Sequence, residues 1–247
     1  MLHDPPSELP ESPTVAQLQQ QLKSSNEVQA KFLSFLSHDL RGELNGVLLT
    51  VELLKHQLSG EPKLAQSVED LDAIRNAIFG AVGVMDRFIK AERLRHGRIV
   101  PKNVTVDVPQ LLAEVAAEFT ADANAKGLEL VVESPRLVQI TTDKALLKLI
   151  LQNLVSNAVK FSSRGRVRLQ AEPAEGPLGP RVWVIDAGPG IAVERHANLF
   201  EPFVGGQLPG KCLGLYLVRQ ATDLLGVKLS VDANPGCGAV FALEFSK

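Results

Sequence analysis

The sequence predicts an α+β protein in which a helical hairpin precedes a domain that mixes strands and helices. From residue 15 to residue 96, apolar side chains recur mostly at three- and four-residue steps, as on one face of a helix. After residue 97, short β-rich runs alternate with helical stretches. We therefore expect three parts: a flexible leader rich in Pro, Ser and Glu (1–14), a hairpin (15–96) and a mixed domain (97–247).

Two long helices are expected in the hairpin, from Val15 to Leu58 and from Leu64 to Leu94. The breaker cluster Ser59-Gly60-Glu61-Pro62 separates them, so they form an antiparallel pair. One hairpin cannot bury both of its apolar stripes. A two-fold dimer that forms a four-helix bundle would bury them, so we expect a homodimer.

The mixed domain is expected to alternate between its two kinds of element. Pro109 suits the first turn of a helix, and Gly127 suits its end. The expected helices are Pro109–Lys126, Asp143–Phe161 and Leu213–Leu225. The expected strands are Val104–Val106, Leu128–Val132, Val167–Leu169, Arg181–Ile185, Val227–Val231 and Ala239–Phe245.

The composition excludes several classes of protein. Apolar residues make up 45% and charged residues 22%, with a net charge of -2 and no basic cluster, so nucleic acid is not expected as a partner. No apolar run approaches the roughly 20 residues of a membrane span. The two cysteines form no CxxC pair, which argues against a zinc site or disulfide framework. We expect a cytoplasmic location, with the alternative that the chain is the intracellular part of a longer, membrane-bound protein.

A polar face on the helix expected at 143–161 is the first candidate site. Asn153, Asn157 and Lys160 are spaced by four and three residues, so they share one face. A carboxamide oxygen can bind Mg²⁺, and a lysine one turn later can meet phosphate charge. An exposed face of an amphipathic helix explains the same pattern equally well.

Two glycine-containing turns follow. An apolar strand ends at Asp186, which can accept a hydrogen bond from an exocyclic amine such as that of adenine. Gly188 and Gly190 would let the backbone approach a ligand. Further on, Gly210-Lys-Cys-Leu-Gly214 opens a helix whose free N–H groups can meet phosphate. Each turn alone is a weak signal, and Phe200-Glu201-Pro202-Phe203 between them is typical of core packing.

The stretch SFLSHDLRGELNG, residues 34–46, places His38, Asp39 and Arg41 on an otherwise apolar helix. Taken alone, it fits a solvated polar face. In order, however, the later motifs resemble the N, G1, F and G2 boxes of the GHKL ATP-binding superfamily. Residues 34–41 resemble the phosphoacceptor H box of sensor histidine kinases, and the resemblance covers roughly residues 15–247.

The resemblance implies an α/β sandwich that binds ATP and Mg²⁺ and phosphorylates His38. From there the phosphoryl group would pass to an aspartate of a response-regulator receiver domain. Asp39 would orient the imidazole, and Arg41 would steer phosphate or pair with an acid in the bundle. Asn157 would bind Mg²⁺, Asp186 would read adenine, and the other residues of the implied nucleotide site are Asn153, Lys160, Phe161, Gly188, Gly190, Ile191, Lys211, Gly214 and Leu215.

Departures from the family pattern leave other functions open. The segment between Phe203 and Gly214 is short, with Lys211 as its basic residue, and Cys212 stands where the family usually has glycine. A degenerate, non-catalytic core that binds other kinases or regulators is therefore an alternative. A third is a GHKL ATPase of the gyrase, mismatch-repair or chaperone type, although such proteins need no H-box histidine.

A further departure predicts weak phosphatase activity. The family usually has Thr or Asn four residues after the histidine and then Pro, whereas this chain has Gly42 and Glu43. In the family that this chain resembles, the hydroxyl or amide at this position places the water that dephosphorylates the regulator. This chain lacks that group. Gly42→Thr is expected to accelerate loss of label from a phosphorylated regulator. A Gly42→Thr protein that folds and still leaves the regulator phosphorylated would contradict this explanation.

Overall fold

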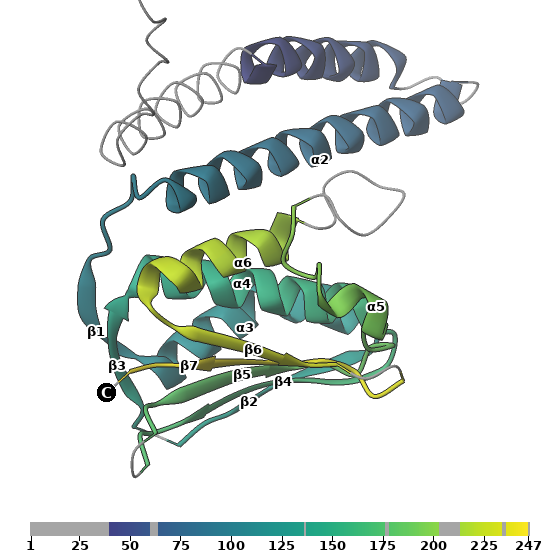
Figure 1. Ribbon diagram of the computed structural model, residues 1–247. Coiled ribbons are helices and arrows are strands. Elements are labelled where there is room, and N and C mark those ends of the chain that lie inside the picture. Colours follow the sequence, from purple (N-terminus) through teal and green to yellow (C-terminus); the bar gives the residue numbers. More distant parts are fainter. Residues whose placement is uncertain are drawn as a thin grey trace, which may run out of the picture.

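The computed structural model describes residues 40–59, 64–135, 137–175, 178–202, 213–233 and 236–246. In this part of the chain a helical hairpin lies above a layer of helices, and the helices lie on a five-stranded sheet (Figure 1). The predicted α+β class is confirmed. None of the helices in the described ranges is both long and apolar enough to cross a bilayer.

The hairpin pairs a helical segment over residues 40–58 with α2 (Ala65–Arg95). Lys55 Nζ donates to Asp72 Oδ1 over 2.7 Å, and Arg41 pairs with Asp86 near the other end of the described hairpin. Of the two roles expected for Arg41, the structure has the pairing with an acid. The rest of the predicted first helix, residues 15–39, and the turn at 60–63 lie outside the described residues.

The second domain has the predicted helices and strands and two elements that were not predicted. In chain order it contains β1 (Asn103–Asp107), α3 (Val108–Ala125), β2 (Leu128–Glu133), β3 (Gln139–Asp143), α4 (Lys144–Phe161), β4 (Gly165–Glu172), β5 (Arg181–Ile185), α5 (Val193–His196), α6 (Leu213–Leu225), β6 (Lys228–Asp232) and β7 (Val240–Glu244). Neither β3 nor α5 was predicted. With four residues, α5 is too short to establish a helical periodicity. β3 runs directly into α4, so no turn signal marks its end.

Two aspartates begin the major helices. Asp107 accepts a hydrogen bond from Gln110 N at the start of α3, and Asp143 accepts one from Leu146 N at the start of α4. Each carboxylate satisfies a backbone N–H that has no partner within the helix. Since β1 pairs antiparallel with β3, both caps lie at the ends of one two-stranded ribbon. The ribbon therefore fixes where α3 and α4 begin.

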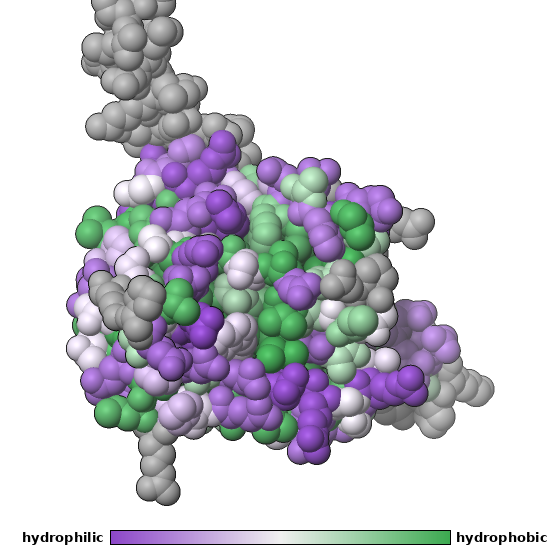
Figure 2. Space-filling view, turned by 60° about the horizontal axis from the view of Figure 1, so that its bottom comes forward, coloured by the Kyte–Doolittle hydropathy of each residue, from purple (hydrophilic) through white to green (hydrophobic). Residues whose placement is uncertain are grey.

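The main sheet has the order β2-β4-β5-β7-β6, with β2 and β4 parallel and the other neighbours antiparallel. In Figure 1, α3, α4 and α6 cover one face of this sheet. The strands bury alternate side chains against these helices. The register places Trp183, Ile185 and Val240 on the other face. Figure 2, which brings the lower side of the molecule forward, shows apolar side chains gathered in the middle of the view, with hydrophilic ones around them.

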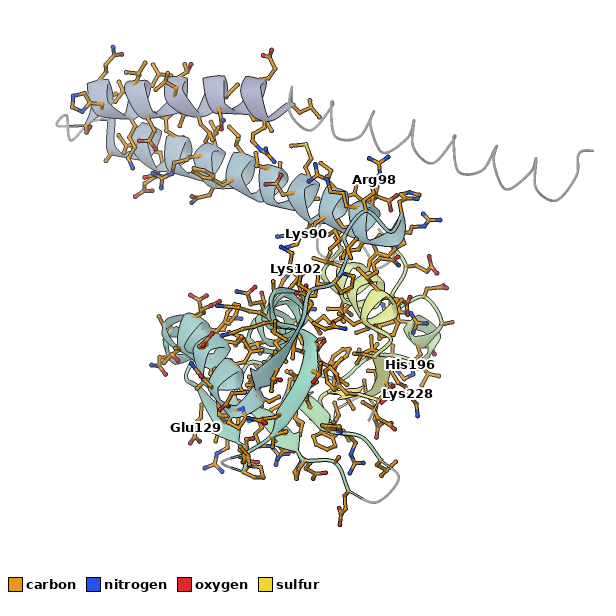
Figure 3. All side chains as sticks on the ribbon, turned by 90° about the vertical axis from the view of Figure 1, so that its left-hand side faces the viewer. Lys90, Arg98, Lys102, Glu129, His196 and Lys228 are labelled. Carbon is orange, nitrogen blue, oxygen red and sulfur yellow. The ribbon has the colours of Figure 1, made fainter. Side chains whose placement is uncertain are left out.

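The last turns of α2 pack on α6 and join the hairpin to the second domain. Ala91 and Leu94 are buried there, and the buried carboxylate of Glu92 accepts a hydrogen bond from Tyr216 Oη over 2.8 Å. His96 Nε2 lies 3.3 Å from the other oxygen of Glu92. Figure 3 shows the basic side chains Lys90, Arg98 and Lys102 around this junction. The predicted domain boundary at residue 97 stays a prediction, although α2 ends close to it, at Arg95.

Tyr216→Phe is expected to lower the free energy of unfolding by about 1–3 kcal/mol, because it leaves the Glu92 carboxylate without its donor. Burial, followed by the hydrogen bond to Glu92, raises the pKa of Tyr216 to about 12. The neutral phenol therefore stabilises the fold below the ordinary tyrosine pKa of about 10, and this stability is lost as pH rises towards 12.

Denaturant unfolding at neutral and alkaline pH measures both effects. The difference between wild type and Tyr216→Phe should be largest below pH of about 10 and should shrink above it. A difference that stays constant from pH 8 to 12 would show that Tyr216 does not titrate with a raised pKa. Tyr216→Phe with wild-type stability at neutral pH would show that the hydrogen bond contributes nothing.

Candidate functional site

Helix α4 is the centre of the candidate site. One face of this helix is buried against the sheet and α6, with side chains that include Ile150, Leu154 and Ala158. Asn153 and Asn157 are half-buried at the margin of that face, and Lys160 is exposed. The burial of one face therefore fixes the direction in which the two carboxamides point.

The first turn of α6 lies beside the two asparagines. A Cβ added to Gly214 would lie 3.2 Å from Asn153 Oδ1 and 3.7 Å from Asn157 Nδ2. Asn153 Nδ2 donates to Leu149 O over 2.7 Å, which leaves its oxygen directed towards Gly214. Three predicted site residues, two on α4 and one on α6, thus meet at one place. The absence of a side chain at Gly214 leaves room there.

The loop that follows β5 lies near the C-terminal end of the same helix. A Cβ added to Gly188 would lie 3.2 Å from Phe161 O, and Asp186 Oδ1 accepts hydrogen bonds from Gly188 N and Ala239 N. About 12 Å of helix axis separates Asn153 from Phe161. The candidate site therefore has two ends along α4, with a carboxylate at one and two carboxamides with Gly214 at the other.

The electrostatics of the loop depend on Asp186. Burial raises the pKa of Asp186 above its ordinary value, and the hydrogen bonds from Gly188 N and Ala239 N offset this only in part. A raised pKa means that the folded state disfavours the ionised carboxylate. An amine donor from a ligand would supply the stabilisation that the folded chain lacks.

The remaining predicted residues take several positions. Lys160 Nζ lies 5.2 Å from the ring centre of Phe161, which is itself exposed. Ile191 and Leu215 are half-buried against the hydrophobic core, and Gly190 adopts a φ of 74°. The residues His38, Asp39, Phe203, Lys211 and Cys212 lie outside the described residues.

Two side chains near the site were not found by the sequence analysis. Lys126 Nζ donates to the carbonyls of Val159 and Lys160 and so satisfies the C-terminal end of α4. His196 Nε2 lies 3.1 Å from two backbone carbonyl oxygens. Neither side chain belongs to a recognisable motif. Each hydrogen-bonds to backbone carbonyls, most of them distant in sequence, and a backbone carbonyl is present at every residue.

The residues present fit a magnesium ion held mainly by a nucleotide. Among the described residues, no three or more His, Cys, Asp and Glu side chains form a cluster that could hold a metal. Mg²⁺ commonly takes one or two protein ligands and fills its other positions with phosphate oxygens and water. The half-buried carboxamide of Asn157, beside Gly214, is suited to be such a ligand.

Comparisons with known proteins agree with this geometry. Residues 142–247 match the family described as "Histidine kinase-, DNA gyrase B-, and HSP90-like ATPase". The chain is 30% identical to the autoinducer 2 sensor kinase/phosphatase LuxQ of Vibrio cholerae, over 90% of this chain and 27% of LuxQ. It is 29% identical to the sensor histidine kinase AruS of Pseudomonas aeruginosa, over 91% of this chain and 23% of AruS. The chain therefore spans about a quarter of the length of these relatives.

Two solved structures are also similar to this chain. The crystal structure of full-length ShkA in complex with AMPPNP is similar at a TM-score of 0.73 and 32% identity, over 87% of this chain and 45% of ShkA. The nucleotide-free catalytic domain of the histidine kinase ThkA is similar at a TM-score of 0.52 and 25% identity, over 59% of this chain and 96% of that domain. The first similarity includes most of the chain, and the second fits one domain.

Asp186→Asn is expected to weaken binding of adenine nucleotides at least about tenfold, because a carboxamide N–H then faces the amine of adenine. The carboxamide oxygen can still accept the hydrogen bonds from Gly188 and Ala239. Because the pKa of Asp186 is raised in the folded state, ionisation of its carboxylate lowers the stability of the wild type as pH rises through that pKa. Asp186→Asn removes this ionisation, so its stability at neutral pH should equal or exceed that of the wild type.

Calorimetric titration with ADP and thermal unfolding of the same samples measure affinity and stability separately. Asp122→Asn, which removes an exposed carboxylate from α3, is the matched control and should leave both unchanged. If Asp186→Asn retains wild-type affinity, Asp186 does not bind the adenine amine. If affinity and stability fall together, the loss reflects misfolding.

Proposed function

The chain belongs to the sensor histidine kinases, and from this premise we propose that it transfers the γ-phosphoryl group of ATP to its own His38. It then passes that group to an aspartate of a response regulator. The observation that carries the proposal is the meeting of Gly214 with Asn153 and Asn157 in the second half of α4. The Asp186 loop lies beside Phe161, about 12 Å of helix axis further on from Asn153. This separation suits a ligand with a base at one end and phosphates at the other.

ATP would lie along α4. Asp186 would accept the adenine amine, and Gly188 and Gly190 would keep the surrounding backbone free of side chains. At the other end, Asn153 would contact phosphates near the first turn of α6, whose free N–H groups favour anions. Lys160, one residue before Phe161, would reach the phosphates with its long side chain. Asn157 would hold Mg²⁺, which supplies neutralisation of phosphate charge when bound. The AMPPNP complex of the similar protein ShkA supports an adenine nucleotide here.

His38 is the proposed nucleophile. A neutral imidazole has a free lone pair near neutral pH, so one ring nitrogen can form the N–P bond while the bond from the γ-phosphorus to the bridging oxygen breaks and ADP leaves. Asp39 would accept or hold the proton on the other ring nitrogen. Because phosphoryl transfer requires mainly positioning and charge neutralisation, this chain needs few further groups.

Dimerisation through the hairpin is also proposed. Leu49, Leu53 and Phe79 are 64%, 56% and 58% exposed in the single chain. Leu49 and Leu53 lie one turn apart on the same helix face. A second copy of the hairpin would cover such side chains in a four-helix bundle.

The phosphoryl acceptor would be a receiver domain, and the reaction would take place in the cytoplasm, where ATP is available. The relative LuxQ is named a sensor kinase/phosphatase. In this chain Gly42 stands in the helix after His38, and a Cβ there would meet no atom within 4 Å. A larger side chain therefore fits at this position. We attribute the proposed weakness of phosphatase activity to the missing hydroxyl or amide at residue 42 and not to a lack of space.

Incubation with γ-labelled ATP and Mg²⁺ is expected to give protein-bound label that is acid-labile and alkali-stable. His38→Ala should lose all of it, because alanine has no nucleophile, and Asn157→Asp tests its dependence on the nucleotide site. Transfer is measured by adding a receiver domain. Absence of label in a folded, dimeric wild-type protein would favour the non-catalytic scaffold. Hydrolysis of ATP without protein label would favour an ATPase of another type.

Leu53→Glu is expected to shift the protein from dimer to monomer, because a charged side chain would be buried in the bundle. Light scattering during size-exclusion chromatography measures the mass. Leu53→Met keeps an apolar side chain of similar volume and should remain dimeric. A wild-type chain that is monomeric at micromolar concentration would refute dimerisation through this face, and an unaffected Leu53→Glu dimer would place the interface elsewhere.

A further inference from the structure

Backbone hydrogen bonds attach the loop after β5 to the connection between β6 and β7. Asp186 N donates to Ala239 O over 2.9 Å, and Gly236 N donates to Pro189 O over 2.7 Å. The two segments are in direct contact, because a Cβ added to Gly238 would lie 2.1 Å from Asp186 O. The position of the Asp186 carboxylate therefore depends on how the two segments are held together.

His196 is a side chain that joins these same two segments. Its Nε2 lies 3.1 Å from Ile191 O, at the end of the loop, and 3.1 Å from Ala233 O, just after β6. Both partners are carbonyl oxygens, which only accept, so Nε2 carries the proton and donates to both. Protonation of the ring adds a proton at Nδ1 and leaves the Nε2–H in place, so the contact exists in both charge states.

The position of His196 in the chain means that its hydrogen bonds do more than pair two carbonyl groups. His196 is the last residue of α5, and it is half-buried (Figure 3). Leu199 and Phe200, a few residues later, pack on the core. Ala233 is 1% exposed, so it is a firm attachment point. The histidine thus connects the loop that carries Asp186 to two segments that are themselves fixed.

We propose that His196 is a positioning residue for the adenine end of the nucleotide. By donating to Ile191 and Ala233 it holds the 186–191 loop in the shape that presents Asp186 and the backbone of Gly188 to the base. This inference rests on the proposed function, because it assumes that the loop binds adenine. A loop held in its binding shape before the ligand arrives lowers the entropic penalty of binding.

Three substitutions distinguish the donor from the mere presence of a side chain. Glutamine can place its Nε2 close to the position of the histidine Nε2 and can donate to both carbonyls. The amide of asparagine corresponds to the Nδ1 position and is too short to reach them. Leucine fills space without a donor. Arg195→Leu, at the exposed neighbouring position of α5, controls for a leucine in this helix.

The dissociation constant for ADP and the kinetic constants for labelling with ATP are measured on the whole chain. His196→Leu and His196→Asn are expected to raise Kd and KM about three- to tenfold, the equivalent of one hydrogen bond, with kcat unchanged. His196→Gln should restore values within about twofold of wild type, and Arg195→Leu should match wild type. Thermal unfolding of each variant shows whether it is folded.

The outcomes separate this inference from the proposed function. If wild type binds ADP and all three His196 variants bind it equally well, His196 has no positioning role. If His196→Gln is as weak as His196→Leu at equal melting temperature, the donor is not what matters, and the inference is wrong. If wild type itself binds no adenine nucleotide, the proposed function fails first, whatever His196 does.

Discussion

The packing of α4 between the sheet and α6 is the constraint on which the rest of the second domain depends. Several leucine, isoleucine and valine side chains of this helix are buried, and each contributes about 1.5–3 kcal/mol when fully removed from water. That burial fixes the rotation of the helix about its axis. Asn153 and Asn157 consequently face the start of α6, where Gly214 allows the close approach.

The loop beside the C-terminal end of α4 combines close backbone packing with a half-buried carboxylate, as is typical of a binding site. Asp186 is held by two backbone donors, yet its pKa is raised because burial outweighs them. Gly238, with a φ of 78°, permits a contact that a side chain would forbid. A half-buried, poorly solvated carboxylate gains more from a ligand donor than a solvated one would.

The contact between α2 and α6 joins the hairpin, which carries the proposed nucleophile His38, to the domain that carries the proposed nucleotide site. The helix that begins at the carboxamides is the same helix that carries Tyr216 to the buried Glu92. A buried carboxylate requires partners, and here it has a phenol, with a histidine and an arginine nearby. A movement that separates α6 from the end of α2 would break this contact, so the hydrogen bond opposes such a separation.

The sequence by itself determined the long helices, most strands and the chemistry of the motifs. Their periodicity, caps and glycines are local, so they can be read without knowing what lies opposite. For the same reason Asn153, Asn157, Asp186 and Gly214 could each be proposed as a candidate site residue. Only their order along the chain and a family resemblance joined them into one site.

The tertiary structure alone decided which groups meet. It placed Gly214 beside the asparagines, paired β3 with β1, joined Glu92 to Tyr216 and directed His196 to two carbonyls. Each of these depends on a contact between residues distant in sequence, or on a side chain bonded to backbone. Such contacts leave no periodic trace, because any donor of the right length at the right place would form them.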